Sequence, residues 1–238
     1  MSKVGVGVSA VEHPAGAEPD LSPNVEMYLK VIVRLYGGDG PVSTSAVARE
    51  LAVSAPSASV MLKRLDADGF VTHEGRQGVI PTPLGSRVGA ITLRRQLLAE
   101  RLLVDRLGIS WEVATGEACR LEHAISPLVE QQLAAFLESP STCPHGHPIP
   151  HADGRIWRHD DAIALTDLDL DAEATVLAVP HDMPELLRFL AETKIGPGAN
   201  VTLRQRDRIV GLLTLDVDGR SRVVSLPLAN NILMRKPS

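Results

Sequence analysis

Cys119, Glu122 and His123 stand in the run C-R-L-E-H and are the residues of this sequence best suited to chemistry. If the segment is helical, their spacing of three and four residues puts a thiolate, a carboxylate and an imidazole on one face. These groups make half of a coordination shell for a divalent transition metal. The alternative interpretation is a buried cysteine beside a solvated Glu-His pair, which an isolated C-x-x-E-H run also fits.

A fourth ligand candidate, Met27, lies far upstream in a predicted helix over residues 24–36. The apolar stripe of that helix has the i, i+3, i+4, i+7 spacing and consists of Leu29, Ile32, Val33 and Tyr36. At about 100° per residue, Met27 points roughly away from this stripe, which leaves its thioether for another use. A thiolate, an imidazole and a thioether favour Fe²⁺, Co²⁺, Ni²⁺ or Zn²⁺ over Mg²⁺ or Ca²⁺.

The elements around and after Met27 follow the pattern of a winged helix. Asn24 is predicted to cap the first helix. A short helix over residues 43–51 and a second one that opens at Pro56 are separated by a tight turn, which is a helix-turn-helix pattern. Residues 70–81 carry β-branched residues on both sides of a Gly-containing turn and predict a β-hairpin wing.

Three more helices are predicted over residues 82–107, 110–123 and 126–137. A winged helix does not need them, so we expect them to form an interface between two copies of the chain. Residues 139–160 are rich in Pro, Gly and His and indicate an irregular domain boundary.

The C-terminal third changes character. Short strands are predicted over residues 175–179, 200–204, 211–217 and 222–226, with a helix over 184–193. Asp218-Gly219 between the last two strands is a strong hairpin signal. These elements predict a small SH3-like β-barrel.

The expected fold class is therefore mainly α with a small β domain: an N-terminal winged helix-turn-helix, a helical dimerisation domain and a C-terminal SH3-like β-barrel. The predicted boundaries are a flexible leader at 1–22, a winged-helix DNA-binding domain at 23–82, a helical metal-binding and dimerisation domain at 83–150, a linker at 151–162 and the SH3-like domain at 163–238.

Charge and composition fit a DNA-binding protein of the cytoplasm. The net charge is −5, but residues 41–107 hold nine Lys/Arg against six Asp/Glu, a local excess of +3. Local charge decides phosphate contact, because distant exposed charges are screened. Two cysteines do not make a disulfide framework, and no run approaches the ~18 apolar residues of a membrane span. We expect a cytoplasmic protein without a membrane partner.

Several segments together resemble the diphtheria toxin repressor family of iron-dependent regulators. They are E-M-Y-L-K at 26–30, S-A-P-S-A-S at 54–59, L-A-E-R-L-L at 98–103, E-A-C-R-L-E-H at 117–123 and P-H-G-H-P-I-P at 144–150. The resemblance implies a dimeric repressor that binds double-stranded operator DNA, with one or two dimers per operator. It maps the principal metal site of the family onto Met27, Cys119, Glu122 and His123.

The resemblance favours iron as the metal. The manganese-type branch of the family carries carboxylates where this chain has Met27 and Cys119, so the expected cofactor is Fe²⁺. Mn²⁺ is the alternative within the family, and Co²⁺, Ni²⁺ or Zn²⁺ are plausible in vitro. Outside the family, one alternative is a small iron metalloenzyme, which would need a further catalytic constellation. Another is a metal-independent architecture in which the barrel is a protein-interaction module.

The second metal site of the family departs from its pattern here. Its two histidines align with Gln96 and Thr115, while its glutamate survives as Glu100. We therefore expect this second site to be weak, altered or absent. Residues of the barrel that could replace the missing ligands are Asp182, Glu185 and His181.

The run from 143 to 151 offers a cysteine and three histidines, Cys143, His145, His147 and His151. A zinc knot is one interpretation, but the prolines would strain a closed tetrahedral site. A structural loop is the interpretation that we prefer.

The resemblance also predicts the DNA contacts. Ser54 and Pro56 suit thymine methyl groups in the major groove. Phosphate contacts are expected from Ser43, Thr44, Ser57, Ser59 and Arg64. The amide with which the family reads a base aligns with Val60, so one base hydrogen bond is lost and sequence preference would shift. Helix capping is the alternative role for the hydroxyls of Ser43 and Ser54.

Overall fold

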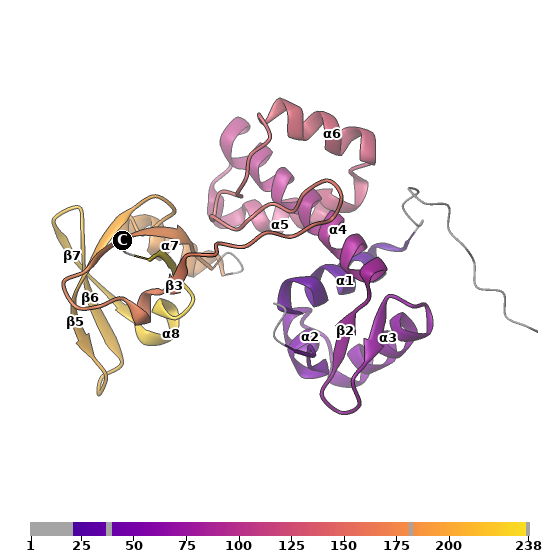
Figure 1. The fold of residues 1–238 in the computed structure, drawn as a ribbon. Helices are drawn as coiled ribbons and strands as arrows, with labels where there is room; N and C mark the ends of the chain where they lie inside the picture. The colour runs from indigo at the N-terminus through magenta and orange to yellow at the C-terminus, as the bar shows by residue number, and fades with distance from the viewer. Residues whose placement is uncertain (1–20, 37–39, 181–182, 237–238) are drawn as a thin grey trace, which may run out of the picture.

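The structure is a computed structural model that describes residues 21–36, 40–180 and 183–236. Figure 1 shows an N-terminal group of helices, a second helical group built on one long helix, and a C-terminal sheet. The buried apolar residues form separate cores in these units. The predicted fold class is confirmed. Among the described residues, no helix is both long enough and apolar enough to cross a membrane.

The N-terminal unit is a winged helix-turn-helix, as predicted. Its elements are α1 (Pro23–Tyr36), α2 (Thr44–Glu50), α3 (Ala55–Ala67), β1 (Val71–His73) and β2 (Val79–Pro81). Ser43 and Ser54 cap α2 and α3, because each hydroxyl accepts a hydrogen bond from the backbone N–H three residues later. The strands β1 and β2 pair in antiparallel fashion and form the wing.

The expectation that Asn24 caps α1 was wrong. The helix begins at Pro23, and the amides of Val25 and Glu26 donate to the carbonyl of Ser22. Proline suits the first helical position because its φ is fixed near the helical value and its missing N–H would have no partner there.

The second unit is built on α4 (Pro83–Arg101). A π-helical turn, η1 (Leu102–Arg106), follows it directly, so the helix predicted to continue to 107 changes its winding near the end. The remaining elements are α5 (Trp111–Leu121), the 3-10 turn η2 (Glu122–Ala124) and α6 (Pro127–Phe136). Glu130 ties α6 to α4 by accepting hydrogen bonds from Arg94 Nε at 2.8 Å and Arg95 Nε at 3.1 Å.

Helix α1 approaches α4 closely because Gly89 leaves no side chain between them. A Cβ at this position would lie 2.5 Å from the carbonyl oxygen of Leu29. The close packing fixes the N-terminal unit on α4, against which α5 and η2 also pack. Residues of α1 can therefore meet residues of α5 and η2 that follow about 90 positions later.

The C-terminal unit is a six-stranded antiparallel sheet of order β3-β8-β4-β5-β6-β7. Its strands are β3 (Ala162–Ala164), β4 (Glu173–Ala178), β5 (Asn200–Asp207), β6 (Leu212–Val217), β7 (Arg220–Ser225) and β8 (Leu233–Arg235). The predicted hairpin is confirmed: Asp218 and Gly219, both at positive φ, join Val217 to its partner Arg220. The short strands β3 and β8 were not predicted.

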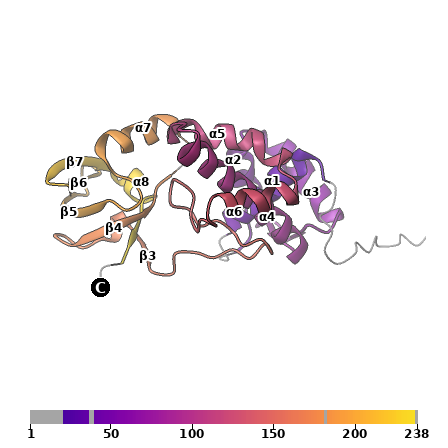
Figure 2. The same ribbon diagram turned by 90° about the horizontal axis from the view of Figure 1, so that it is seen from above.

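The sheet unit also carries η3 (Leu165–Asp167), α7 (Pro184–Thr193) and α8 (Leu226–Ala229). Figure 2 shows the sheet at one end of the molecule and the winged helix at the other, with α7 beside α5. The irregular segment between α6 and β3 connects the units. It also contacts the sheet, because the amide of Val179 donates to the carbonyl of His145 at 3.0 Å.

Candidate metal centres and DNA-binding face

The predicted trio of Cys119, Glu122 and His123 lies at the end of α5, facing α1. The helix ends at Leu121, so Glu122 and His123 belong to the 3-10 turn η2 rather than to one continuous α-helix. Glu122 is fully buried, whereas Cys119 is partly exposed. Met27 on α1 and Cys119 on α5 line the same cavity, so the structure brings the distant thioether beside the thiol.

His123 is held in the tautomer that a metal ligand requires. Its Nδ1 lies 2.6 Å from Oε2 of Glu26, and because a carboxylate accepts hydrogen bonds, we assign the proton to Nδ1. The lone pair is then on Nε2, which lies 3.1 Å from Oε1 of Glu122. Two buried atoms here, His123 Nε2 and Glu122 Oε2, make no hydrogen bond. A bound cation would satisfy both.

Electrostatics at this centre are set by burial and by Lys30. Burial raises the pKa of the Glu122 carboxyl, and the neighbouring Lys30 ammonium opposes that rise. Burial likewise raises the pKa of the Cys119 thiol, again against the influence of Lys30. Lys30 Nζ donates to Glu122 Oε1 at 2.6 Å and lies 3.8 Å from Cys119 Sγ.

A second group of ligands was not predicted. Within the described part of the chain, Glu100, Cys143 and His145 form the one group of three whose ligand atoms all lie within 4.8 Å of one another, and all three residues are buried. The trio of Cys119, Glu122 and His123 is less tightly gathered and is not a group of this kind. Glu100 comes from α4, and the other two come from the C-P-H-G-H segment.

His145 is oriented as a ligand by both of its ring nitrogens. Nε2 lies 3.0 Å from the carbonyl oxygen of Trp111, which can only accept, so we assign the proton to Nε2. Nδ1 then turns its lone pair toward Glu100 Oε2 at 3.3 Å. A proton on either atom makes this contact a hydrogen bond, and a metal ion bound between the two atoms would take the place of that proton. A ring N–H bonded to a backbone carbonyl is the usual support of a metal-binding histidine.

The pKa of the Cys143 thiol is raised well above its ordinary value, chiefly by burial. The backbone N–H groups of His145 and His147 donate toward its sulfur, which lowers the pKa of the thiol, although burial and Glu100 raise that pKa further and prevail. The turn needs glycine at Gly146, where φ is +88° and a Cβ would lie 1.9 Å from the carbonyl oxygen of Leu177.

The predicted second-site residues Gln96 and Thr115 lie between these two centres. Gln96 Nε2 donates to Glu100 Oε1 at 3.1 Å. Gln96 Oε1 and Thr115 Oγ1 are buried without a hydrogen-bond partner, and both residues line the cavity that holds Met27 and Cys119. Of the barrel residues that could replace the missing ligands, His181 and Asp182 lie outside the described residues, and Glu185 is exposed in the first turn of α7.

The predicted DNA contacts lie on α3 and at the starts of α2 and α3. Ser54, Pro56, Ser57, Val60 and Arg64 are all exposed, and 71% of Val60 is accessible. Ser43, Thr44 and Ser59 are half-buried. The caps described above occupy Ser43 and Ser54, and Ser54 Oγ also lies 2.8 Å from Ser57 Oγ. The capping role of Ser43 and Ser54 is therefore confirmed, and their contacts with DNA stay a prediction.

Comparisons with known proteins decide the family. The profile described as "Iron dependent repressor, N-terminal DNA binding domain" matches residues 20–79, and "Iron dependent repressor, metal binding and dimerisation domain" matches 82–151. The "FeoA domain" matches 163–236. The iron-dependent repressor IdeR of Mycobacterium tuberculosis (strain ATCC 25618 / H37Rv) is 31% identical over 86% of this chain and 93% of its own length. This chain belongs to the iron-dependent repressor family.

Other relatives of this repressor give the same picture. IdeR of Mycobacterium leprae is 37% identical over 77% of this chain and 85% of its own length. A solved structure described as a manganese-dependent transcriptional repressor in complex with manganese has a TM-score of 0.81 and 31% identity, covering 88% of this chain and 98% of that one. The family comprises transcriptional repressors, so this member is a metal-dependent DNA-binding repressor and not an enzyme.

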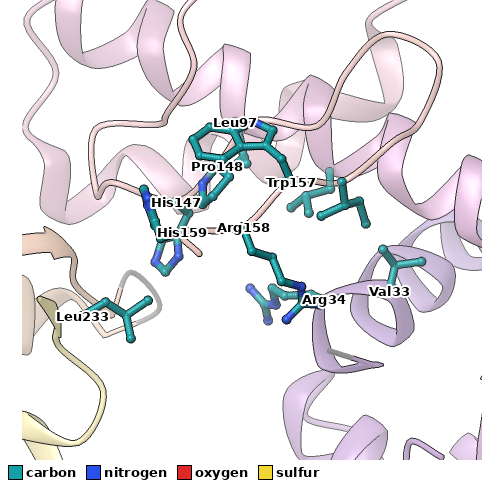
Figure 3. A pocket seen from close by; sticks show the side chains of 11 residues that line it. Val33, Arg34, Leu97, His147, Pro148, Trp157, Arg158, His159 and Leu233 are labelled. Carbon is teal, nitrogen blue, oxygen red and sulfur yellow. The ribbon is translucent and has the colours of Figure 1, made fainter. Parts of the chain in front are cut away.

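The repressor has another cavity of about 420 Å³ where its units meet. Figure 3 shows Arg34 of α1 and Arg158 of the connecting segment approaching each other at its edge, with Trp157 and Leu97 on the apolar side. His147 Nε2 donates to the carbonyl of Val179 at 2.8 Å, and His159 Nε2 donates to that of Gly146 at 2.9 Å.

The histidines of the connecting segment therefore divide between two roles. His147 braces the loop through its backbone contact, and His151 is exposed, so neither belongs to the group formed by Cys143 and His145. A four-ligand zinc knot is thus not what these described residues form. The preference for a structural loop was right for His147 but missed the pairing of Cys143 and His145 with Glu100.

Proposed function

We propose that this repressor senses Fe²⁺ through Met27, Cys119, Glu122 and His123. The observation that carries the proposal is His123, whose Nδ1–H is held by Glu26 while its Nε2 and the second oxygen of Glu122 have no hydrogen-bond partner. Glu26 and Met27 belong to α1, whereas Glu122 and His123 belong to η2. Helix α1 therefore supplies one ligand and the residue that orients His123, and η2 supplies two more ligands.

The site lies where it could control DNA binding. Helix α1 packs against α2 and β2 in the winged helix, and η2 packs on α4. Helix α1 already packs on α4 at Gly89, so an ion shared by Met27 and the η2 ligands would add a second link between the winged helix and the helical unit and thereby restrict the orientation of α3. By linkage, operator DNA must then tighten metal binding by the same factor.

The donor set favours iron over manganese. A thiol and a thioether are soft donors, which Mn²⁺ binds less well than Fe²⁺. The relatives named IdeR are called iron-dependent, whereas one structural neighbour is described with manganese and another, ScaR, with Zn²⁺. Mn²⁺ or another divalent metal is therefore the alternative activator.

Glu100, Cys143 and His145 are proposed as an altered second site. The thiol and imidazole of the C-P-H-G-H turn stand in for the histidines that the family resemblance placed at Gln96 and Thr115. Glu100 remains a ligand in both interpretations, and Gln96 orients its other oxygen.

The repressor is proposed to act in the cytoplasm as a homodimer on palindromic DNA, with one or two dimers per operator. Exposed apolar side chains on α5 and α6 offer a face for the second copy: Val113, Leu121, Leu128, Val129 and Phe136. Dimer symmetry would place the two α3 helices one turn of DNA, or a multiple of it, apart.

The test uses full-length protein stripped with a chelator under anaerobic conditions, and a DNA duplex that the metal-loaded protein selects from a random pool. Mobility shifts across Fe²⁺, Mn²⁺, Co²⁺ and Zn²⁺ should show DNA binding only when a metal is present. Fe²⁺ should activate binding at a lower free concentration than Mn²⁺. Met27→Ala and Cys119→Ala should abolish the metal response. DNA binding that survives chelation would instead support metal-independent architecture.

A further inference from the structure

Lys30 is the one lysine of α1, and its ammonium lies among the candidate ligands of the first metal centre. Nζ is 2.6 Å from Glu122 Oε1 and 3.8 Å from Cys119 Sγ. The side chains of Lys30 and Glu122 are 4% and 0% exposed. Lysine is rarely buried this deeply unless it is paired, and both of its contacts here are predicted metal ligands.

The ammonium supplies the positive charge that the centre requires when no metal is bound. A buried carboxylate without a counter-charge would be costly, and Lys30 removes that cost for one oxygen of Glu122. The other oxygen and Nε2 of His123 remain without hydrogen-bond partners. Lys30 thus satisfies part of the ligand set and leaves the remainder for an ion.

A divalent ion and the ammonium cannot share these ligands without strong repulsion. Two positive charges about 4 Å apart repel strongly at the effective dielectric constant of a protein site. Cys119 and Glu122 would therefore have to exchange Lys30 for the metal. The ligand atoms of Cys119, Glu122 and His123 lie farther apart than those of the group around Glu100. This spacing is consistent with the Lys30 ammonium lying among them.

The first metal centre adjoins a cavity into which the Lys30 ammonium can move. A cavity of about 270 Å³ is lined by Lys30, Met27 and Cys119, by the ion pair of Arg34 with Glu50, and by Glu112. A lysine has a flexible four-carbon stem, so its ammonium can leave Glu122 and move into this cavity, where Glu112 is the carboxylate not held by Arg34.

We propose that Lys30 is a tethered cation that competes with the activating metal for Cys119 and Glu122 and so sets the metal concentration at which the repressor responds. This inference rests on the proposed metal site and adds the residue that tunes its affinity. It makes Lys30 a residue that sets the metal affinity rather than a ligand. The competing role is a positioning one, in which Lys30 holds Glu122 in place for the metal. The two roles predict opposite changes in affinity.

The experiment titrates Co²⁺ into full-length, chelator-stripped protein and follows the thiolate-to-cobalt charge-transfer absorption. To isolate the first centre, all variants carry Cys143→Ser, which removes the other thiolate. Lys30→Met should bind Co²⁺ about tenfold or more tightly, because an opposing charge has been removed without loss of stem packing. Lys30→Arg, which keeps the charge, should bind no more tightly than the parent. Lys236→Met, at an exposed position, is the matched control.

A second measurement establishes whether the Lys30→Met variant is folded. Thermal unfolding of the metal-free Lys30→Met protein should remain cooperative, with a lower midpoint because Glu122 has lost its partner. Equal or weaker cobalt binding by cooperatively folded Lys30→Met would overturn the role of Lys30 and leave the metal site standing. Absence of the absorption band in the parent and in every variant would overturn the site itself, and the inference with it.

Discussion

Nδ1 of His123 and Oε2 of Glu26 lie 2.6 Å apart, although the two residues are 97 positions apart in the chain. The contact joins α1 to η2 without any metal and fixes which ring nitrogen can act as a ligand. It also makes Glu26, the neighbour of Met27, part of the centre. A carboxylate that orients a ligand histidine in this way raises the basicity of the ring and fixes its direction.

Replacing Glu26 with alanine should weaken metal binding about 10- to 100-fold, the usual effect of losing such an orienting partner. Isothermal titration with Co²⁺ measures the change. Glu192→Ala, at an exposed position of α7, is the matched control and should leave the affinity unchanged. An unaltered affinity in Glu26→Ala would contradict the role of Glu26 in orienting His123 for the metal.

The second centre predicts two metal ions per chain with unequal affinities. His145→Phe keeps a ring on Trp111, against which the imidazole now stacks at 5.3 Å, but removes both nitrogens. The metal content after loading should fall from two to one per chain, as measured by elemental analysis with protein quantification. A wild-type protein that loads only one ion would contradict the proposed second site, and two equally tight sites would contradict its altered character.

Metal affinity should rise with pH because the ligand thiols hold protons. Burial raises the pKa of the Cys119 thiol above its ordinary value of 9.0, so at neutral pH the thiol is protonated in the metal-free protein. Coordination requires the thiolate and releases that proton. The metal affinity should therefore increase by up to about tenfold per pH unit for each thiol proton that the metal displaces.

Co²⁺ titrations at several pH values between about 6.5 and 8, in buffers that do not bind metal, measure this slope. Cys119→Asp offers a carboxylate that is already ionised over this range, so its slope should be shallower in the Cys143→Ser background. Equal slopes with and without the thiol would show that Cys119 is not a ligand.

The sequence predicted the helices well because their periodicity and caps are local signals. Ser43 and Ser54 each precede an apolar repeat, and both cap as expected. The meeting of His145 with Glu100, 45 residues away, could not be predicted, because it depends on how the turn at Gly146 docks against Leu177. The signal available in the sequence was a cysteine and a histidine close to Gly146, because a glycine in such a run is typical of a tight turn.

The burial of Lys30 could not be predicted from the sequence either. The pattern of α1 identifies its apolar stripe, but the burial of a lysine depends on a carboxylate 92 residues later. The triad itself was predicted on one helix face, yet the α-helix ends at Leu121. Spacing therefore found the ligands, whereas the geometry among them came from the packing of α1 against α4 and α5.

Leu128→Asp should weaken dimerisation. Leu128 lies on α6, is 68% exposed and is one of the apolar side chains proposed above as the dimer face. A carboxylate in a packed interface loses its hydration without gaining a partner, which costs several kcal/mol. Sedimentation or light scattering over a concentration series gives the dimer constant. Ile209→Asp, at a fully exposed position in the loop between β5 and β6, is the matched control, and an equal effect of the two would refute the face on α5 and α6.

Arg64 on α3 is predicted to contact a phosphate. It is exposed and makes only a 3.6 Å ion pair with Asp68, which is weak enough to exchange for DNA. Arg64→Ala should weaken metal-activated binding to all duplexes about equally and reduce the salt slope of log K by about one unit. Arg235→Ala on β8 is the control. If Arg64 instead reads a base, its loss would relax preference at one operator position, so selection from a random pool distinguishes a phosphate contact from a base contact.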